Sequence, residues 1–263
     1  GGTGISSVPL VNSQVGSVNF FDEQTLIFSS PTLGLAETVV VPSNASAKSV
    51  ADVLNEALSP KGLQFTAENR VQIELDATTG NPISFELIGK NNQPLLIDAE
   101  YNSTIGLKGL AQSLNTMSPT TGITAQVSSD SNRLVLIRAD GGDIAVSNVR
   151  NANLSLQALD GNFDTLGNSA ALTPSVTNSL VFSGLVTVNS DATLSLSSAQ
   201  GTNLTSTKNN YLSSAVSRHL TDAGDTALFE FHDIPAVDGN ASEGTNALVH
   251  QAGHKVTLTI TKE

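Results

Sequence analysis

The feature that most constrains this chain is an internal repeat. Residues 51–55 read Ala-Asp-Val-Leu-Asn and residues 111–115 read Ala-Gln-Ser-Leu-Asn, which sets the offset at 60 positions (51 to 111). At the same offset, residues 62–63 read Gly-Leu and residues 122–123 read Gly-Ile. Self-similarity at a fixed spacing indicates that each copy is one supersecondary unit. The first part of the chain is therefore expected to contain the same unit twice in succession.

Each copy is predicted to contain a strand, a helix and two further strands. In the first copy, residues 38–41 are apolar and β-branched, as strands prefer. Val50, Val53, Leu54 and Ala57 then form one apolar stripe of a helix over residues 49–58. Pro60 and Gly62 follow that helix and are expected to end it.

Two half-buried strands are predicted after each helix, because apolar and polar residues alternate there. In the first copy these strands are residues 63–67 and 71–75. In the second copy a helix over 107–115, with Leu107, Leu110, Ala111 and Leu114 inward, precedes strands at 123–127 and 133–137.

The chain beyond residue 150 is predicted to be mainly β and to lack a clear repeat. Strands are expected at 180–188, 193–197, 227–231 and 255–260. Residues 180–183 read Leu-Val-Phe-Ser and resemble Leu-Ile-Phe-Ser at 26–29, so a degenerate third copy remains an alternative.

The predicted fold class is therefore α+β and β-rich, with two tandem strand-helix-strand-strand repeats followed by a mainly β domain. Residues 1–25 are expected to be a linker or a leading strand. Residues 26–150 form the repeat domain, with copies at about 26–88 and 89–150. Residues 151–263 form a second, mainly β outer domain.

Composition excludes several classes of protein. The formal net charge of −12 repels phosphate backbones, so nucleic-acid binding is not expected. The chain has no cysteine, which excludes disulfides and thiolate metal sites. No apolar run approaches the roughly 18 residues of a membrane helix, so no membrane insertion is expected. Without an initiating methionine, and with Gly-Gly-Thr-Gly at its start, the chain is interpreted as a piece of something larger.

The second copy carries a family resemblance. Residues 110–115 (Leu-Ala-Gln-Ser-Leu-Asn), 121–127 (Thr-Gly-Ile-Thr-Ala-Gln-Val), 134–136 (Leu-Val-Leu) and 140–141 (Asp-Gly) resemble the inserted repeat of bacterial flagellins, which also occurs in the filament cap protein. Residues 85–99, which include Ile-Asp-Ala at 97–99, are similar to the segment that joins such repeats in large flagellins. The likeness covers about residues 26 to 150, and the long terminal helices of the filament core are missing from this sequence.

The resemblance implies a structural outer domain of a flagellar filament protein, preferably flagellin, that is extracellular and performs no catalysis. Its partners would be neighbouring flagellin subunits, bound through regions absent from this sequence. A filament cap or hook-associated protein is one alternative. An adhesin-type module that contacts a host surface or a glycan is another, and it would show an exposed aromatic or carboxylate cluster in a groove. An enzyme inserted after residue 150 would instead need clustered histidines and carboxylates.

Four histidines are the candidates for catalysis or metal binding: His219, His232, His250 and His254. None lies in an HExxH motif. His250 and His254 are separated by Gln-Ala-Gly leading into a strand, and His232 with Glu230 and Asp233 fits a strand end. We therefore predict no catalytic, cofactor-binding or metal-binding residues.

Two polar patterns have simpler interpretations. Asp130, Asp140 and Asp143 lie near Asn132 and Gly141 in a composition that could bind calcium, but turn chemistry is the preferred explanation. Asn-x-Ser/Thr sequons occur at Asn44, Asn102, Asn153, Asn203 and Asn240. In a chain so rich in serine, threonine and asparagine they do not indicate glycosylation.

Overall fold

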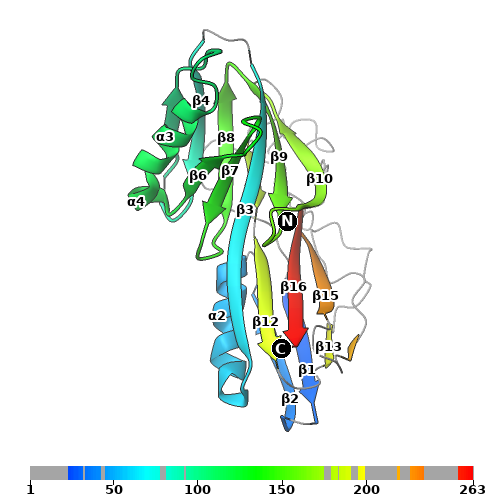
Figure 1. Ribbon diagram of the computed structural model, residues 1–263. Coiled ribbons are helices and arrows are strands. Elements are labelled where there is room, and N and C mark those ends of the chain that lie inside the picture. The colour runs from blue at the N-terminus through cyan, green and yellow to red at the C-terminus, as the bar shows by residue number, and fades with distance from the viewer. Residues whose placement is uncertain are drawn as a thin grey trace, which may run out of the picture.

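A computed structural model of the chain gives a mostly β architecture with a few helices (Figure 1), which confirms the β-rich α+β class. The structure describes residues 23–31, 33–42, 45–77, 81–91, 93–174, 179–182, 184–190, 195–198, 218–219, 226–233 and 254–262.

The elements follow one another along the chain in three groups. The first group is β1 (Gln24–Ser30), β2 (Leu35–Val41), α2 (Ala47–Leu58), the short 3-10 helix η1 (Ser59–Lys61) and β3 (Gln64–Asp76). The second is β4 (Ile83–Ile88), β5 (Leu95–Ala99), α3 (Lys108–Thr116), α4 (Ser118–Thr121), β6 (Thr124–Val127), β7 (Arg133–Arg138) and β8 (Ile144–Arg150). The third is β9 (Asn153–Leu159), β10 (Thr165–Leu172), β11 (Ser179–Phe182), β12 (Leu185–Ser190), β13 (Ser195–Ser198), β14 (Arg218–His219), β15 (Thr226–Asp233) and β16 (His254–Lys262).

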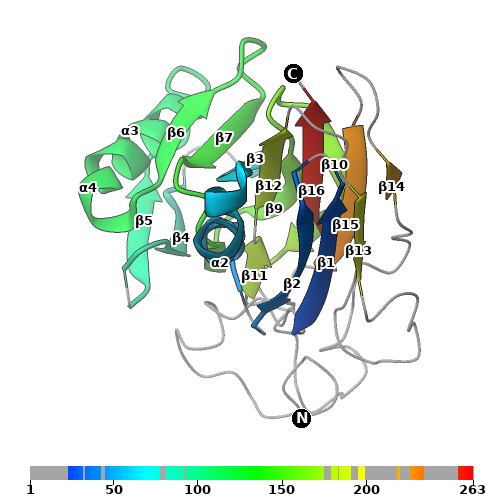
Figure 2. The same cartoon turned by 90° about the horizontal axis from the view of Figure 1, so that it is seen from below.

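The molecule consists of two lobes that share the long strand β3 (Figure 1). The α2 lobe contains β1, β2, α2, the first half of β3 and β12, and its core includes Phe28, Leu54 and Phe65. The α3 lobe contains the second half of β3 and β4 to β11, and its core includes Phe85 and Leu114. In Figure 2, α2 is seen end-on near the centre and α3 lies at the edge of the molecule, so each lobe has its own helix.

Strand pairing shows that the α3 lobe is inserted into the α2 lobe. Residues 64–68 of β3 pair with β12, from Gln64 opposite Asn189 to Glu68 opposite Leu185. Residues 69–76 of the same strand pair with β7 and β9. The chain thus leaves the α2 lobe along β3, builds the α3 lobe and returns along β12.

The two strands expected at 63–67 and 71–75 are one continuous strand, so this part of the prediction was wrong. The intervening residues, Glu68, Asn69 and Arg70, include no glycine or proline to form a turn. The buried positions also keep the same phase, because residues 65, 69, 71 and 73 are all buried. An unbroken period of two is the signature of a single strand. In the second copy the corresponding strands are separate, because Ser128 to Asn132 form a turn between β6 and β7.

The sheets cross the domain boundary that the sequence suggested at residue 150. That boundary lies between β8 and β9, yet β9 and β12 pair with β3, β11 pairs with β8, and β13 pairs with β1. Strands β9 to β13 therefore complete sheets that begin before residue 150. Of the leading segment 1–25, only residues 23–25 fall among the described residues.

The two helices lie close to their predicted positions. In α3 the four residues expected to face inward, residues 107, 110, 111 and 114, are all buried. In α2 the buried residues are Ala47, Val50, Ala51, Leu54 and Leu58, whereas Ala57 is exposed. The apolar stripe of α2 is therefore rotated slightly from the predicted one.

Each helix ends in the same way and holds the strand that follows it. Gly62 and Gly122 have φ angles of 90° and 72°, the left-handed conformation that favours glycine. The side chain of Asn55 donates to the Phe65 carbonyl at 2.8 Å and accepts from the Phe65 N–H at 2.7 Å. Asn115 makes the same two bonds to Ala125, at 2.9 and 2.8 Å. The amide of each asparagine thus takes the place of a neighbouring strand along one edge of β3 or β6.

Replacing either asparagine by alanine is expected to lower the free energy of unfolding by about 1.5 kcal/mol, because one buried backbone N–H and one C=O lose their partners. Urea denaturation of the Asn55→Ala and Asn115→Ala variants checks this. Gln112→Ala, on the exposed face of α3, is the control and should change the free energy by less than about 0.5 kcal/mol. Asparagine variants as stable as the control would contradict the role of these bonds.

Candidate functional site

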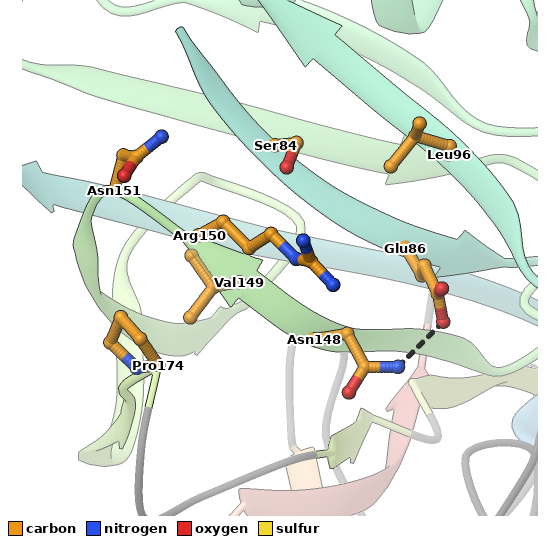
Figure 3. A pocket seen from close by; sticks show the side chains of 8 residues that line it. All are labelled: Ser84, Glu86, Leu96, Asn148, Val149, Arg150, Asn151 and Pro174. Carbon is orange, nitrogen blue, oxygen red and sulfur yellow. Dashed lines mark hydrogen bonds between the residues drawn. The ribbon is translucent and has the colours of Figure 1, made fainter. Parts of the chain in front are cut away.

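A groove of about 830 Å³ lies on the outer face of the β11-β8-β4-β5 sheet. Figure 3 shows the residues that line it, which are Ser84, Glu86, Leu96, Asn148, Val149, Arg150, Asn151 and Pro174. Two of these residues lie on β4, where successive side chains point to opposite faces of the sheet. Because Ile83, Phe85 and Leu87 face the core, Ser84 and Glu86 face outward. We call this hollow the outer groove.

A β-bulge in β8 shapes the outer groove. Glu86 lies opposite Ser147 and Ser84 lies opposite Arg150, so β8 has one more residue than β4 over this stretch. The extra residue lets Val149 point into the core while Asn148 and Arg150 lie on the outer face. Bulges bend a strand and redirect its side chains, and they are frequent next to binding sites.

The charged groups of the outer groove come from two neighbouring strands. The Asn148 amide donates to the Glu86 carboxylate at 2.7 Å, as the dashed line in Figure 3 marks. Arg150 is exposed and lies beside this pair on β8. Leu96, with 58 % of its surface exposed, forms an apolar border on β5. The groove therefore offers both signs of charge together with uncharged hydrogen-bonding groups.

A second hollow, of about 470 Å³, adjoins the outer groove and shares Asn151 and Pro174 with it. Its other lining residues are Asp76, Ala77, Asn81, Ala152 and Asn153. The Asn151 amide donates to the Pro82 carbonyl at 2.7 Å, which fixes the corner between β8 and β9. The two hollows form one polar trough.

The histidines are placed on strands, except His250, which lies outside the described residues. His219 ends β14 and lies opposite Ser195 of β13. β14 is the edge strand of a different sheet from the one that contains β15 and β16. In the β15–β16 pair, His254 lies opposite Asp233 and His232 lies opposite Lys255. Glu230 lies on the same strand, opposite Thr257. Within the described part of the chain, no group of three or more histidines and carboxylates could hold a metal ion.

The aspartates flagged in the sequence take part in turns. Asp140 accepts from the Arg138 guanidinium and from the Gly142 N–H, both at 2.9 Å. Asp143 uses its main-chain carbonyl to accept from Arg138. Asp130 accepts from the Ser128 hydroxyl and from the Asn132 N–H, and these bonds hold the pKa of Asp130 below its usual range.

Two of the sequon asparagines have structural surroundings that can be described. Asn102 accepts from the N–H groups of Thr104 and Ile105 and so forms the turn before α3. Asn153 is exposed at the start of β9, on the border of the second hollow. Asn44, Asn203 and Asn240 lie outside the described residues. Within the described residues, no helix is long and apolar enough to cross a lipid bilayer.

The outer groove could not be predicted from the sequence. Its residues come from β4, β5 and β8, and the bulge that shapes it exists only because β8 pairs with β4. One signal was present in the sequence: Asn148 and Asn151 lie three residues apart, and asparagine tolerates left-handed backbone better than most residues. Both do adopt positive φ angles, 51° and 63°.

Comparison with known proteins gives little. No family model matches the chain. No curated protein matches it either. Among solved structures, the flagellar cap protein FliD from Helicobacter pylori is similar to it at 12 % sequence identity, with a TM-score of 0.23. The alignment covers 52 % of this chain and 51 % of that one, so the chain spans about half the length of that structure.

Proposed function

We propose that this chain is a non-catalytic, surface-exposed outer domain of a bacterial flagellar filament protein, with flagellin as the preferred parent. The observation that carries the proposal is the recurrence of one helix-to-strand unit at an offset of 60. Asn55 and Asn115 each make two hydrogen bonds to the backbone of the residue ten positions later. This supports a duplication of the unit, as the resemblance to flagellin repeats requires.

The residues that carry the resemblance also have defined roles in that unit. Thr121 is fully buried, and its hydroxyl accepts from the Ile123 N–H at 3.1 Å. Gly122 supplies the left-handed residue, Ile123 enters the core, and Ala125 receives the Asn115 bonds. A chance match in a serine- and threonine-rich chain would not concentrate on positions that the fold requires.

The fold also fits a function that depends on shape. Two lobes with separate apolar cores, joined by the continuous strand β3, make an elongated body (Figure 1). A body of this kind, displayed on a filament, sets the thickness and the surface chemistry of that filament. The net charge of −12 would keep such a surface soluble.

Immunogold electron microscopy tests the proposal. Antibodies raised against the chain are applied to intact cells of the bacterium that encodes it, and pre-immune serum is the control. Gold along the whole length of the filament is the expected result for flagellin.

Other labelling patterns would contradict the preferred parent. Gold confined to the filament tip would make the parent a cap protein, and gold at the junction of hook and filament would make it a hook-associated protein. Labelling of the cell surface away from filaments would refute the flagellar proposal and favour an adhesin.

A further inference from the structure

We infer that the outer groove is a binding site for acidic oligosaccharides, with the Arg150 guanidinium as the anchor of the acidic group. This inference does not depend on which protein the chain belongs to. It rests on the chemistry of the groove, taken from the residues on β4, β5 and β8.

Arg150 has the properties of an anchor. It is exposed in the outer groove, and Figure 3 shows its side chain extending in the direction of Glu86 and Asn148. Among the described residues, the arginines in ion pairs are Arg70, Arg133 and Arg138, and Arg150 is in none. The neighbouring Glu86 carboxylate is already held by the Asn148 amide at 2.7 Å. A guanidinium free in this way can receive a carboxylate through two parallel hydrogen bonds.

The remaining polar groups match hydroxyls. Ser84, Asn148 and Asn151 each carry donors and acceptors, and Glu86 carries acceptors. The second hollow extends the trough with Asn81, Asn153 and Asp76. A sugar hydroxyl both donates and accepts, so a chain of sugars can use this mixture along its length. Leu96 and Pro174 offer apolar contacts for the C–H faces of the rings.

Two other classes of ligand fit less well. An extended peptide would add to a sheet through an open backbone edge, but the floor of the groove is β4 and β8, which pair with each other and with β5 and β11. Nucleic acid would need a basic surface and aromatic stacking. The chain carries a net charge of −12, and no aromatic side chain lines either hollow.

Two side-chain hydrogen bonds hold the backbone on either side of Arg150. Asn148 and Asn151, which flank it, have φ angles of 51° and 63°. A left-handed conformation costs a non-glycine residue of order 1 kcal/mol, and such residues cluster at binding sites. Here the two residues aim one amide at Glu86 and the other at the Pro82 carbonyl.

The test is an NMR titration of the whole ¹⁵N-labelled chain with sialyllactose, in which the amide chemical shifts are measured at each step. Lactose is the matched neutral probe. Saturable shifts at residues 84, 86, 148, 150 and 151 are expected, with tighter binding of the acidic probe. Arg150→Gln should weaken sialyllactose binding roughly tenfold and leave lactose unchanged, because a charge-assisted hydrogen bond is worth about 1.5 kcal/mol or more. Arg150→Lys should retain part of the affinity, since the charge remains but the fork is lost.

The control variant is Lys61→Gln, which removes an exposed charge in the other lobe and should not alter binding. Three results would overturn the inference. These are an absence of saturable shifts in the groove, equal weakening by Lys61→Gln, and binding of hexaglutamate or sulfate at these amides as tight as that of sialyllactose. The last result would mean that the groove recognises a peptide or any small anion.

Discussion

Replacing Gly141 by alanine is expected to lower the free energy of unfolding by about 4 kcal/mol, through two costs that add. Its φ angle is +79°, where an L side chain costs roughly 1–2 kcal/mol. A Cβ there would also lie 2.8 Å from the Ala67 carbonyl carbon and 2.9 Å from the Glu68 nitrogen, both in the backbone of β3. Overpacking against backbone of this kind costs typically 1–3 kcal/mol.

The matched control is Gly34→Ala. Gly34 has a φ of +61°, but nothing lies within 4 Å of a Cβ built on it, so only the conformational cost applies. Chemical denaturation of both variants separates the two terms. Equal losses of stability would show that close packing against β3 is not the cause.

The Gly141 turn also connects the lobes directly. Its carbonyl accepts from the Lys48 N–H at 3.0 Å, one of the first N–H groups of α2, which lack partners within their own helix. If the turn moves to relieve the clash, this bond breaks as well. The Gly141→Ala variant should therefore show faster amide hydrogen exchange at Lys48, whereas Gly34→Ala should not.

Asn69→Ala is expected to cost about 3 kcal/mol. Asn69 is 1 % exposed and lies in β3 at the passage from one lobe to the other. Its amide donates to the carbonyls of Gly142 and Phe182, at 2.9 and 2.8 Å. Alanine would remove both hydrogen bonds, and losing the partner of a buried polar group costs about 1–3 kcal/mol.

Urea denaturation at neutral pH measures this loss, and Asn153→Ala is the control because Asn153 is exposed on β9. Asn69→Leu separates the loss of the hydrogen bonds from the loss of side-chain volume, because leucine fills the space of asparagine but has no donor. If Asn69→Leu were as stable as the parent chain, the two hydrogen bonds would not be the source of the stability that Asn69 provides.

Local features of the fold could be predicted from the sequence. The apolar spacing in 107–115 defined the buried face of α3, and Pro60, Gly62 and Gly122 marked the helix ends, because these signals act within one or two turns. The continuity of β3 was harder to predict, because Glu68, Asn69 and Arg70 interrupt the apolar alternation between Phe65 and Val71, although they include no glycine or proline to form a turn.

Long-range features could not be predicted in this way. The partner of the first half of β3 is β12, whose residues lie about 120 positions further along the chain, from Gln64 to Asn189. No local pattern specifies such a partner. The outer groove has the same origin, since Arg150 and Ser84 become neighbours only through the β4–β8 register. Sequence reading therefore identified the helices and missed the surface most suited to binding.

The insertion of one lobe into the other makes the α3 lobe replaceable. Glu68 and Leu185 lie side by side as a strand pair, so the chain leaves and re-enters the α2 lobe at one place. Domain insertion is tolerated where the two ends of a segment lie close together. The α2 lobe can thus stay constant while the α3 lobe is exchanged, and the surface that the α3 lobe presents, including the outer groove, can vary.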